Sequence, residues 1–261
     1  MSLSDKNIEL RRYSQRALDE VDHPFVRPIL GSRSVPVYLS DPYILYEKLA
    51  LSILDSSLVC LELGCGTGRH SVVLLENNSS VILSDISLEA LKVAEKKFSP
   101  FYGNFSVAIA DIESLPFPNS TFDVICCSGS LSYGDPLLVF SEIRRCLRIG
   151  GTVLFLDSLN SNPIYHFNRW LHYLRGHRTK STIERIPSIE LLENFSSDFL
   201  HSRIDYFGSS VFLMGIINFI VGPIFALNIY KFLDKLIKPR KSAFNFVLFA
   251  TDFHKVKNVP Q

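Results

Sequence analysis

Two hydrophobic patterns alternate along the middle of the chain, between residues 58 and 157. Short apolar runs bounded by polar or glycine residues are separated by longer segments in which apolar residues recur every three or four positions. The short runs predict buried strands, and the longer spacing predicts amphipathic helices. Strands that alternate with helices predict βαβ units and hence a mostly parallel sheet covered by helices.

Seven strands follow from this pattern. They are predicted at 58–63, 80–85, 105–110, 122–127, 152–157, 201–207 and 243–253. Several of them end in polar residues, among them Asp85, Asp111 and Asp157. Because ligands of open α/β sheets bind beyond the carboxyl ends of the strands, these residues mark the expected binding edge. Before the first strand, residues 4–20 predict an amphipathic helix or a loose arm, and residues 42–54 a second helix.

A glycine-rich turn follows the first strand, in the stretch Glu62-Leu63-Gly64-Cys65-Gly66-Thr67-Gly68. Closely spaced glycines let the backbone approach a ligand, and the N–H groups at the next helix start then face it. A phosphate-binding P-loop requires Lys-Ser/Thr after the last glycine, whereas Arg69-His70 follows here. A dinucleotide fingerprint would place its third glycine at Arg69 or Ser71, so that interpretation is strained.

This stretch resembles the first motif of class I S-adenosylmethionine-dependent methyltransferases. Two further segments, 111–125 and 142–152, resemble runs typical of the small-molecule members of that family, with Ile149 where a proline is usual. Together with Asp85 the motifs cover residues 55–157, about two-fifths of the chain. The resemblance implies a Rossmann-like, doubly wound α/β fold with seven strands, and S-adenosyl-L-methionine as the cofactor.

By this resemblance the glycines pass beneath the methionine part of the cofactor, and Glu62 orients its amino group. Asp111 would bind the adenine amino group, with Ile112 against the ring. Asp85 lies about twenty residues beyond the glycines, where an acid reaches a ribose hydroxyl pair. The alternative is that Asp85 and the residues beside it cap the next helix. The predicted cofactor site comprises Glu62, Gly64, Cys65, Gly66, Gly68, Asp85, Ile86, Asp111, Ile112 and Ser128, without a metal.

The acceptor site is expected after the fifth strand. The sulfonium of the cofactor is already activated, so the protein mainly has to orient the acceptor and exclude water. A hydroxyl acceptor also needs a base. Pro163 is predicted to start a helix capped by Asn162, with Ile164, Phe167 and Leu171 facing the core. Candidate bases are His166 and His172, and candidate ligands of an anionic acceptor group are Tyr165, Arg169, Arg175 and Arg178. A solvated basic helix face is the alternative.

An apolar stretch covers residues 211–230, between the last two strands. Gly222-Pro223 interrupts it, and the flanking strands belong to one sheet, so we do not expect it to cross a membrane. It predicts either a helical hairpin packed against the domain or a dimer partner, or an apolar lobe resting on a membrane. The basic residues that follow suit an anionic leaflet, and the acceptor would then be a lipid or lipid-linked sugar. These residues are Lys231, Lys235, Lys238, Arg240 and Lys241.

Composition narrows the function further. Lys and Arg number 27 against 26 Asp and Glu, so no global field attracts nucleic acid. The turn after the fourth strand also lacks the Asn/Asp-Pro-Pro-aromatic sequence of enzymes that methylate amino groups of nucleic-acid bases.

The five cysteines lack metal-ligand spacing and predict buried free thiols in a reducing cytoplasm. Cys126 and Cys127 are expected to lie in a buried strand rather than to serve as nucleophiles. The polar N-terminus does not resemble a secretion signal.

We therefore predict a cytoplasmic methyltransferase that acts on oxygen or carbon of a small or lipid-associated acceptor, with possible peripheral membrane contact or homodimer formation. Residues 1–54 are predicted as a helical cap, in which Tyr13 and Tyr38 are candidate lid or packing residues. Residues 55–261 are predicted as the methyltransferase domain, with an acceptor-side helical region at 158–200 and an insertion at 209–241. A nicotinamide-dependent oxidoreductase and a membrane-recruited, non-catalytic module remain the alternatives.

Overall fold

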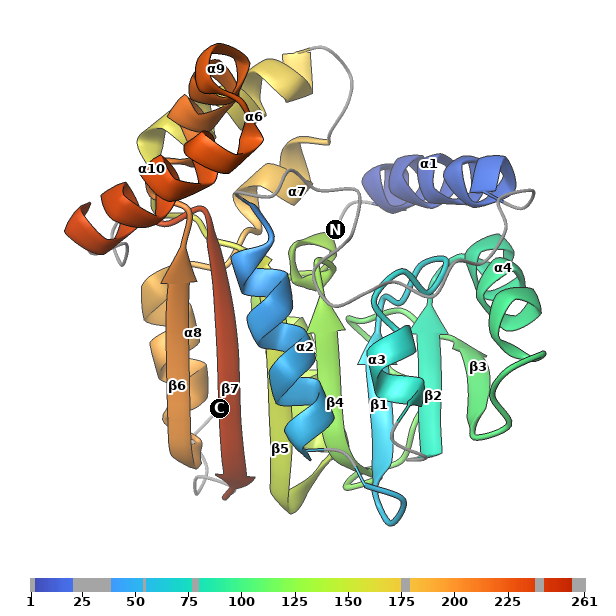
Figure 1. The fold of residues 1–261 in the computed structure, drawn as a ribbon. Helices are drawn as coiled ribbons and strands as arrows, with labels where there is room; N and C mark the ends of the chain where they lie inside the picture. The colour runs from blue at the N-terminus through green and yellow to red at the C-terminus, as the bar shows by residue number, and fades with distance from the viewer. Residues whose placement is uncertain are drawn as a thin grey trace.

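The computed structural model describes residues 3–20, 39–53, 55–76, 80–174, 179–237 and 242–254. Its centre is one seven-stranded sheet with the strand order β3-β2-β1-β4-β5-β7-β6 (Figure 1). The strands are β1 (Val59–Leu63), β2 (Ser80–Asp85), β3 (Phe105–Ile109), β4 (Phe122–Ser128), β5 (Leu147–Ser158), β6 (Phe199–Phe207) and β7 (Asn245–Phe253). The predicted fold class is confirmed.

Strands β3, β2, β1, β4 and β5 are parallel, whereas β7 runs antiparallel to both of its neighbours, β5 and β6. The apolar runs place six of the strands within two residues of their observed starts. The exception is β5, which begins at Leu147 rather than at the predicted residue 152. Gly150 has a φ of 78°, a conformation that glycine adopts without a Cβ penalty, and the strand continues through it.

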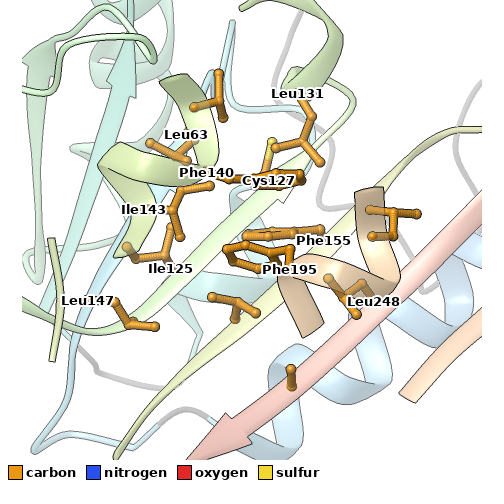
Figure 2. Close-up of a cluster of buried hydrophobic side chains, with 14 of the residues drawn as sticks. Leu63, Ile125, Cys127, Leu131, Phe140, Ile143, Leu147, Phe155, Phe195 and Leu248 are labelled. Atoms are coloured by element: carbon orange, nitrogen blue, oxygen red, sulfur yellow. The ribbon is translucent and has the colours of Figure 1, made fainter. Parts of the chain in front are cut away.

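Helices cover both faces of the sheet. One face carries α2 (Asp41–Ile53), α3 (Val72–Leu75) and α4 (Leu88–Phe98), and the other carries α5 (Pro136–Cys146) and α8 (Ile189–Ser196). On the second face, the rings of Phe140 and Phe195 stack with their centroids 4.3 Å apart, and Phe155 of β5 lies beside them (Figure 2). Burial of these aromatic and aliphatic side chains is the main stabilising contribution to a fold of this kind.

The remaining helices lie at the edge where the parallel strands end (Figure 1). They are α1 (Leu3–Glu20), α6 (Pro163–Leu174), α7 (Lys180–Glu184), α9 (Val211–Val221) and α10 (Pro223–Ile237), with a short 3-10 helix at Leu131–Tyr133. The two N-terminal helices have different places. α1 lies beyond the strands, whereas Tyr46 and Ala50 of α2 are buried against the sheet. The domain boundary predicted after residue 54 therefore falls between α2 and the sheet on which it packs.

The stretch between β6 and β7 forms a hairpin of two helices, α9 and α10, which turns at Gly222. Met214, Ala226 and Tyr230 are buried, but Phe219 is 91% exposed and Ile220 71% exposed. One side of the predicted hairpin thus packs against the domain, and the other side is exposed. Across the residues that the structure describes, neither these helices nor any others combine the length and apolar character needed to cross a membrane.

The orientation of α6 also corrects an expectation. Its cap is as predicted, because the Asn162 side chain accepts a hydrogen bond from the N–H of Ile164 at 2.9 Å. However, Ile164 and Phe167 are 45% and 60% exposed rather than facing the core, while Tyr165 and Arg169 are buried. The physical reason is that Tyr165 and Arg169 find backbone acceptors inside, at Gly208 and Leu159.

Candidate functional site

A pocket opens at the carboxyl ends of the parallel strands and contains about 820 Å³ of empty space, its open mouth included. Backbone and side chains from the ends of four strands meet α1 around it. The lining residues are Lys6, Glu9, Leu10, Tyr13, Gly64, Gly66, Asp85, Ile86, Ala110, Asp111, Ile112, Ser128, Gly129, Ser130 and Tyr133.

The glycine turn after β1 forms one wall, and its three glycines differ in their surroundings. All have positive φ: 63° at Gly64, 56° at Gly66 and 77° at Gly68. A Cβ at Gly64 would lie 2.4 Å from the Ser130 Cβ, and one at Gly68 would lie 2.3 Å from the Phe98 ring. A Cβ at Gly66 would meet no atom within 4 Å. Gly64 and Gly68 are therefore required for packing, and Gly66 leaves its backbone open beside the pocket.

Asp85, the last residue of β2, ties the glycine turn to the next helix. Its Oδ2 accepts a hydrogen bond from the Gly66 N–H at 2.8 Å, and its Oδ1 accepts one from the Ser87 N–H at 2.9 Å. Burial raises the pKa of the Asp85 carboxyl, and these N–H groups partly offset that effect. Ser87 itself caps α4, as its position in the sequence allows, by accepting from the Ala90 N–H. The lone pairs of the carboxylate that these backbone partners leave can accept from a ligand hydroxyl.

Asp111, which follows β3, forms an ion pair with Lys6 of α1, and Lys6 also pairs with Glu113. Burial alone would raise the pKa of Glu113, but hydrogen bonds from Lys6 and from the Asp135 N–H lower it to about 2. The pKa of Lys6 is raised: burial acts to lower it, and the hydrogen bonds to the two carboxylates outweigh that effect. Arg185 adds a second cation at Glu113, with Nη1 3.1 Å from Oε1.

Other contacts hold α1 over the pocket. The buried Glu9 carboxylate accepts from the Thr179 hydroxyl at 2.9 Å, and Ser14 donates to Glu89 at 2.9 Å. The hydroxyls of Tyr13 and Tyr133 are hydrogen-bonded, and their rings meet edge to face with centroids 5.2 Å apart. Tyr13, a predicted lid or packing residue, thus lines the pocket, and Tyr38 lies outside the described residues.

Seven of the ten predicted cofactor residues line this one pocket: Gly64, Gly66, Asp85, Ile86, Asp111, Ile112 and Ser128. The Ser128 hydroxyl oxygen is buried and has no hydrogen-bond partner among the described residues, which suits a site that a ligand completes. Glu62, Cys65 and Gly68 belong to the same strand and turn but are not among the lining residues, and Glu62 is 1% exposed.

The predicted acceptor residues are elsewhere. Tyr165, His166 and Arg169 are on α6 and do not line the pocket. The His166 pKa is lowered, first by burial and then by the Arg169 charge. His172 lies in α6, and Arg175 and Arg178 lie outside the described residues. The assignment of these residues to the acceptor and to a base stays a prediction.

The sequence predicted a helical cap with Tyr13 as a lid candidate, but it did not single out the other residues of α1 that line the pocket. Lys6, Glu9 and Leu10 line the pocket together with Tyr133 of the 3-10 helix. The amphipathic pattern of residues 4–20 indicated the helix, but it does not indicate which part of the sheet the helix covers. The cysteines behave as predicted: all five are buried and free, and burial raises the pKa of the Cys127 thiol.

Comparison with known proteins adds to this geometry. Residues 61–155 match the family model described as a methyltransferase domain. The malonyl-[acyl-carrier protein] O-methyltransferase of Marinomonas sp. is 34% identical over 129 residues, which are 48% of this chain and 47% of that protein. The sterol 4-C-methyltransferase strm-1 of Caenorhabditis elegans is 30% identical over 134 residues, 50% of this chain and 39% of that protein. The chain thus spans about half the length, or less, of these relatives.

Among solved structures, the geranyl diphosphate C-methyltransferase of Streptomyces coelicolor, crystallised with S-adenosyl-L-homocysteine, superposes with a TM-score of 0.60. The superposition covers 97% of this chain and 100% of that one at 17% sequence identity. At this level of identity the likeness establishes the fold.

Proposed function

Because residues 61–155 form a methyltransferase domain of class I, we propose that this chain transfers a methyl group from S-adenosyl-L-methionine to a small or lipid-associated acceptor. The observation that carries the proposal is the convergence of Gly66, Asp85, Asp111 and Ser128 on one pocket. These residues come from the ends of four neighbouring strands, and each offers a group that an adenosine-containing ligand can use. The family match and the pocket support the same ligand independently.

The cofactor roles follow from the chemistry of each group. Asp85 would accept hydrogen bonds from the ribose hydroxyls with the lone pairs that its backbone partners leave. Asp111 would accept from the adenine amino group, with Ile112 against the ring. Gly66 would let the ligand approach the backbone, and the Ser128 hydroxyl would gain the partner that it lacks among the described residues.

The bound cofactor supplies an activated methyl group, and the protein has to bind the acceptor in line with it and keep water out. Helix α1 serves the second task, because Leu10 and Tyr13 line the pocket beneath it. The acceptor atom in this proposal is an oxygen or a carbon.

The acceptor class rests on two kinds of support. The relatives named above act, by their names, on malonyl-[acyl-carrier protein] and on a sterol, and the structural neighbour acts on geranyl diphosphate. The sterol and the geranyl chain are apolar, whereas the malonyl acceptor is a carboxylate borne by a carrier protein. In this chain the helices beyond β5 and β6 expose many apolar side chains at the same edge of the sheet as the pocket. The exposed apolar helices lead us to favour a small, apolar or lipid-linked acceptor.

The test is a calorimetric titration of the purified chain with S-adenosyl-L-methionine and with S-adenosyl-L-homocysteine, and with NAD as the control. We expect both sulfur nucleosides to bind and NAD not to bind. Binding of NAD alone would favour the oxidoreductase alternative, and no binding in a folded sample would contradict the proposal. Methyl transfer to extracted lipids, followed by mass spectrometry, then tests the acceptor class.

A further inference from the structure

Helices α6, α9 and α10 form a lobe beside α7, at the edge of the sheet where the pocket opens (Figure 1). The Tyr165 hydroxyl of α6 donates to the Gly208 carbonyl, just before α9, and the Tyr165 and Phe212 rings are 6.5 Å apart. Asn162 donates to the Ser242 carbonyl, after α10. We call the three helices the apical lobe. These contacts join its parts into one body.

The apical lobe exposes apolar side chains on all three helices. Phe219, Ile220, Ile224, Phe225, Phe232 and Leu236 of the hairpin are each at least 67% exposed, and on α6 the exposed rings of Phe167 and Trp170 stack at 5.9 Å. The buried Met214, Ala226 and Tyr230 hold the other side of the hairpin to the protein. The outer side therefore has no cover from the described residues of this chain. Exposed apolar side chains gathered on neighbouring helices in this way indicate an interaction site.

Charge distinguishes the possible partners. Residues 158–178 and 209–241 together contain eight Lys and Arg, of which Arg169 is buried, and a single acid, Asp234, which leaves 19 Lys and Arg against 25 Asp and Glu in the rest of the chain. Asp234 is turned inward, where it accepts hydrogen bonds from the Gly208 N–H at 2.9 Å and from Ser210. Lys231 and Lys235 are exposed on α10. The outer side of the lobe is thus apolar and cationic, on a protein that is otherwise acidic.

We propose that the apical lobe is an interfacial docking surface for an anionic phospholipid leaflet. Apolar side chains inserted at the headgroup boundary, with lysines among the anionic headgroups, are the pattern of a monotopic anchor. α9 and α10 have 11 and 15 residues, too few to span the hydrocarbon core, so the hairpin rests in one leaflet. A second copy of this chain fits less well, because two surfaces of the same positive charge would face each other.

This inference concerns a surface outside the pocket and is independent of the proposed methyl transfer, although docking would bring the pocket edge toward lipid-borne acceptors. Its test uses the full chain without cofactor, so failure of docking and failure of cofactor binding are separate results. The chain has one tryptophan, Trp170, which lies on α6 of the apical lobe and is 48% exposed. Its fluorescence therefore reports directly whether that part of the lobe enters an apolar environment.

The experiment combines Trp170 emission with sedimentation on vesicles of phosphatidylcholine alone or mixed with phosphatidylglycerol. We expect binding to the mixed vesicles with a blue shift of the emission. Phe219→Asp should weaken binding at least about tenfold, as expected for one large apolar side chain. Lys231→Ala and Lys235→Ala should each weaken it about fivefold. Leu137→Asp, at a 72% exposed residue of α5, is the matched control and should bind as the unmodified chain does.

Three outcomes would overturn the proposal. The first is a folded chain that binds neither kind of vesicle, and the second is equal binding by the Phe219→Asp and Leu137→Asp variants. The third is a dimer in light scattering that Phe219→Asp converts to a monomer, together with no vesicle binding, which would assign the surface to a second copy. Far-UV circular dichroism of each variant establishes that it is folded. Because Phe219 is almost fully exposed, its substitution leaves the packed side of the hairpin unchanged.

Discussion

Lys6 of α1 forms an ion pair with Asp111, the residue that the family resemblance assigns to the adenine amino group. The same lysine pairs with Glu113, two residues further along. Lys6 of α1 therefore neutralises the Asp111 carboxylate, which the proposed cofactor would use. The proposed cofactor contact and the Lys6 contact of α1 would then involve the same carboxylate, in which Lys6 already occupies Oδ2.

Replacement of Lys6 by methionine tests this overlap. Lys6→Met frees Asp111, while Glu9 and Ser14 continue to hold α1 through Thr179 and Glu89. We expect affinity for S-adenosyl-L-methionine to rise by up to about fivefold, the equivalent of about 1 kcal/mol for a partly exposed ion pair. Calorimetric titration provides the measurement, and Lys6→Arg, which keeps the charge, is the control. A weaker complex with Lys6→Met would mean that Lys6 assists binding rather than competing with it.

Asp85→Ala removes the acceptor that we assign to the ribose. We expect the binding free energy of the cofactor to fall by about 1–3 kcal/mol, as for a lost hydrogen-bond partner with a charge. The Gly66 and Ser87 N–H groups also lose an acceptor, so some loss of thermal stability should accompany the change. Asp55→Asn, in an exposed loop, is the control for the loss of one negative charge. Unchanged affinity in Asp85→Ala would remove Asp85 from the site.

Two glycines of the same turn should respond differently to alanine. In Gly68→Ala the new Cβ would collide with the Phe98 ring at a positive φ, and we expect the free energy of unfolding to fall by about 2–5 kcal/mol. In Gly66→Ala there is open space, so the loss should be about 1–2 kcal/mol from the positive φ alone. Denaturant unfolding measures both values.

Gly66→Ala should nevertheless reduce cofactor affinity more than its small effect on stability suggests, because its Cβ would occupy space beside the pocket. Titration of the folded variant with S-adenosyl-L-homocysteine checks this expectation. An affinity equal to that of the unmodified chain would show that the ligand does not approach Gly66.

Glu113 makes the stability depend on pH. Its pKa is lowered from 4.5 to about 2, so the folded state favours the carboxylate form. The stabilisation is fully present above pH 4.5 and is lost as the pH falls toward about 2. Glu113→Gln should therefore lose less stability than the unmodified chain over this interval. Denaturant unfolding at a series of pH values gives the comparison, and Glu184→Gln, at an exposed ion pair with Lys180, should retain the original pH dependence.

The sequence predicted the sheet well because strand positions depend on local apolar runs and turns. The end residues Asp85 and Asp111 could be placed at one edge because carboxyl ends of parallel strands meet there. The pairing of Lys6 with Asp111 spans 105 residues, and no local pattern carries that information. For this reason α1 was expected, while its lining of the pocket through Lys6 and Glu9 was not.

The error at α6 has a different origin. An apolar helix face is expected to turn toward the core, and that rule places Ile164 and Phe167 inside. In the structure the buried side belongs to Tyr165 and Arg169, whose polar atoms have backbone acceptors, and the apolar side belongs to the exposed apical lobe. The rule assumes that water surrounds the protein on every side, and it would not hold for a surface that faces a lipid leaflet, as proposed for this lobe.

The position of β7 between β5 and β6 has a consequence for biosynthesis. A ribosome makes β6 and the whole α9–α10 hairpin before it makes β7, the strand that joins both to the rest of the sheet. During that interval β6 has no neighbouring strand in the sheet, because its only pairing is with β7. The hairpin is then exposed to chaperones, or to a nearby bilayer, before its final position is fixed. Insertion of the last strand completes the sheet and attaches the lobe in one step.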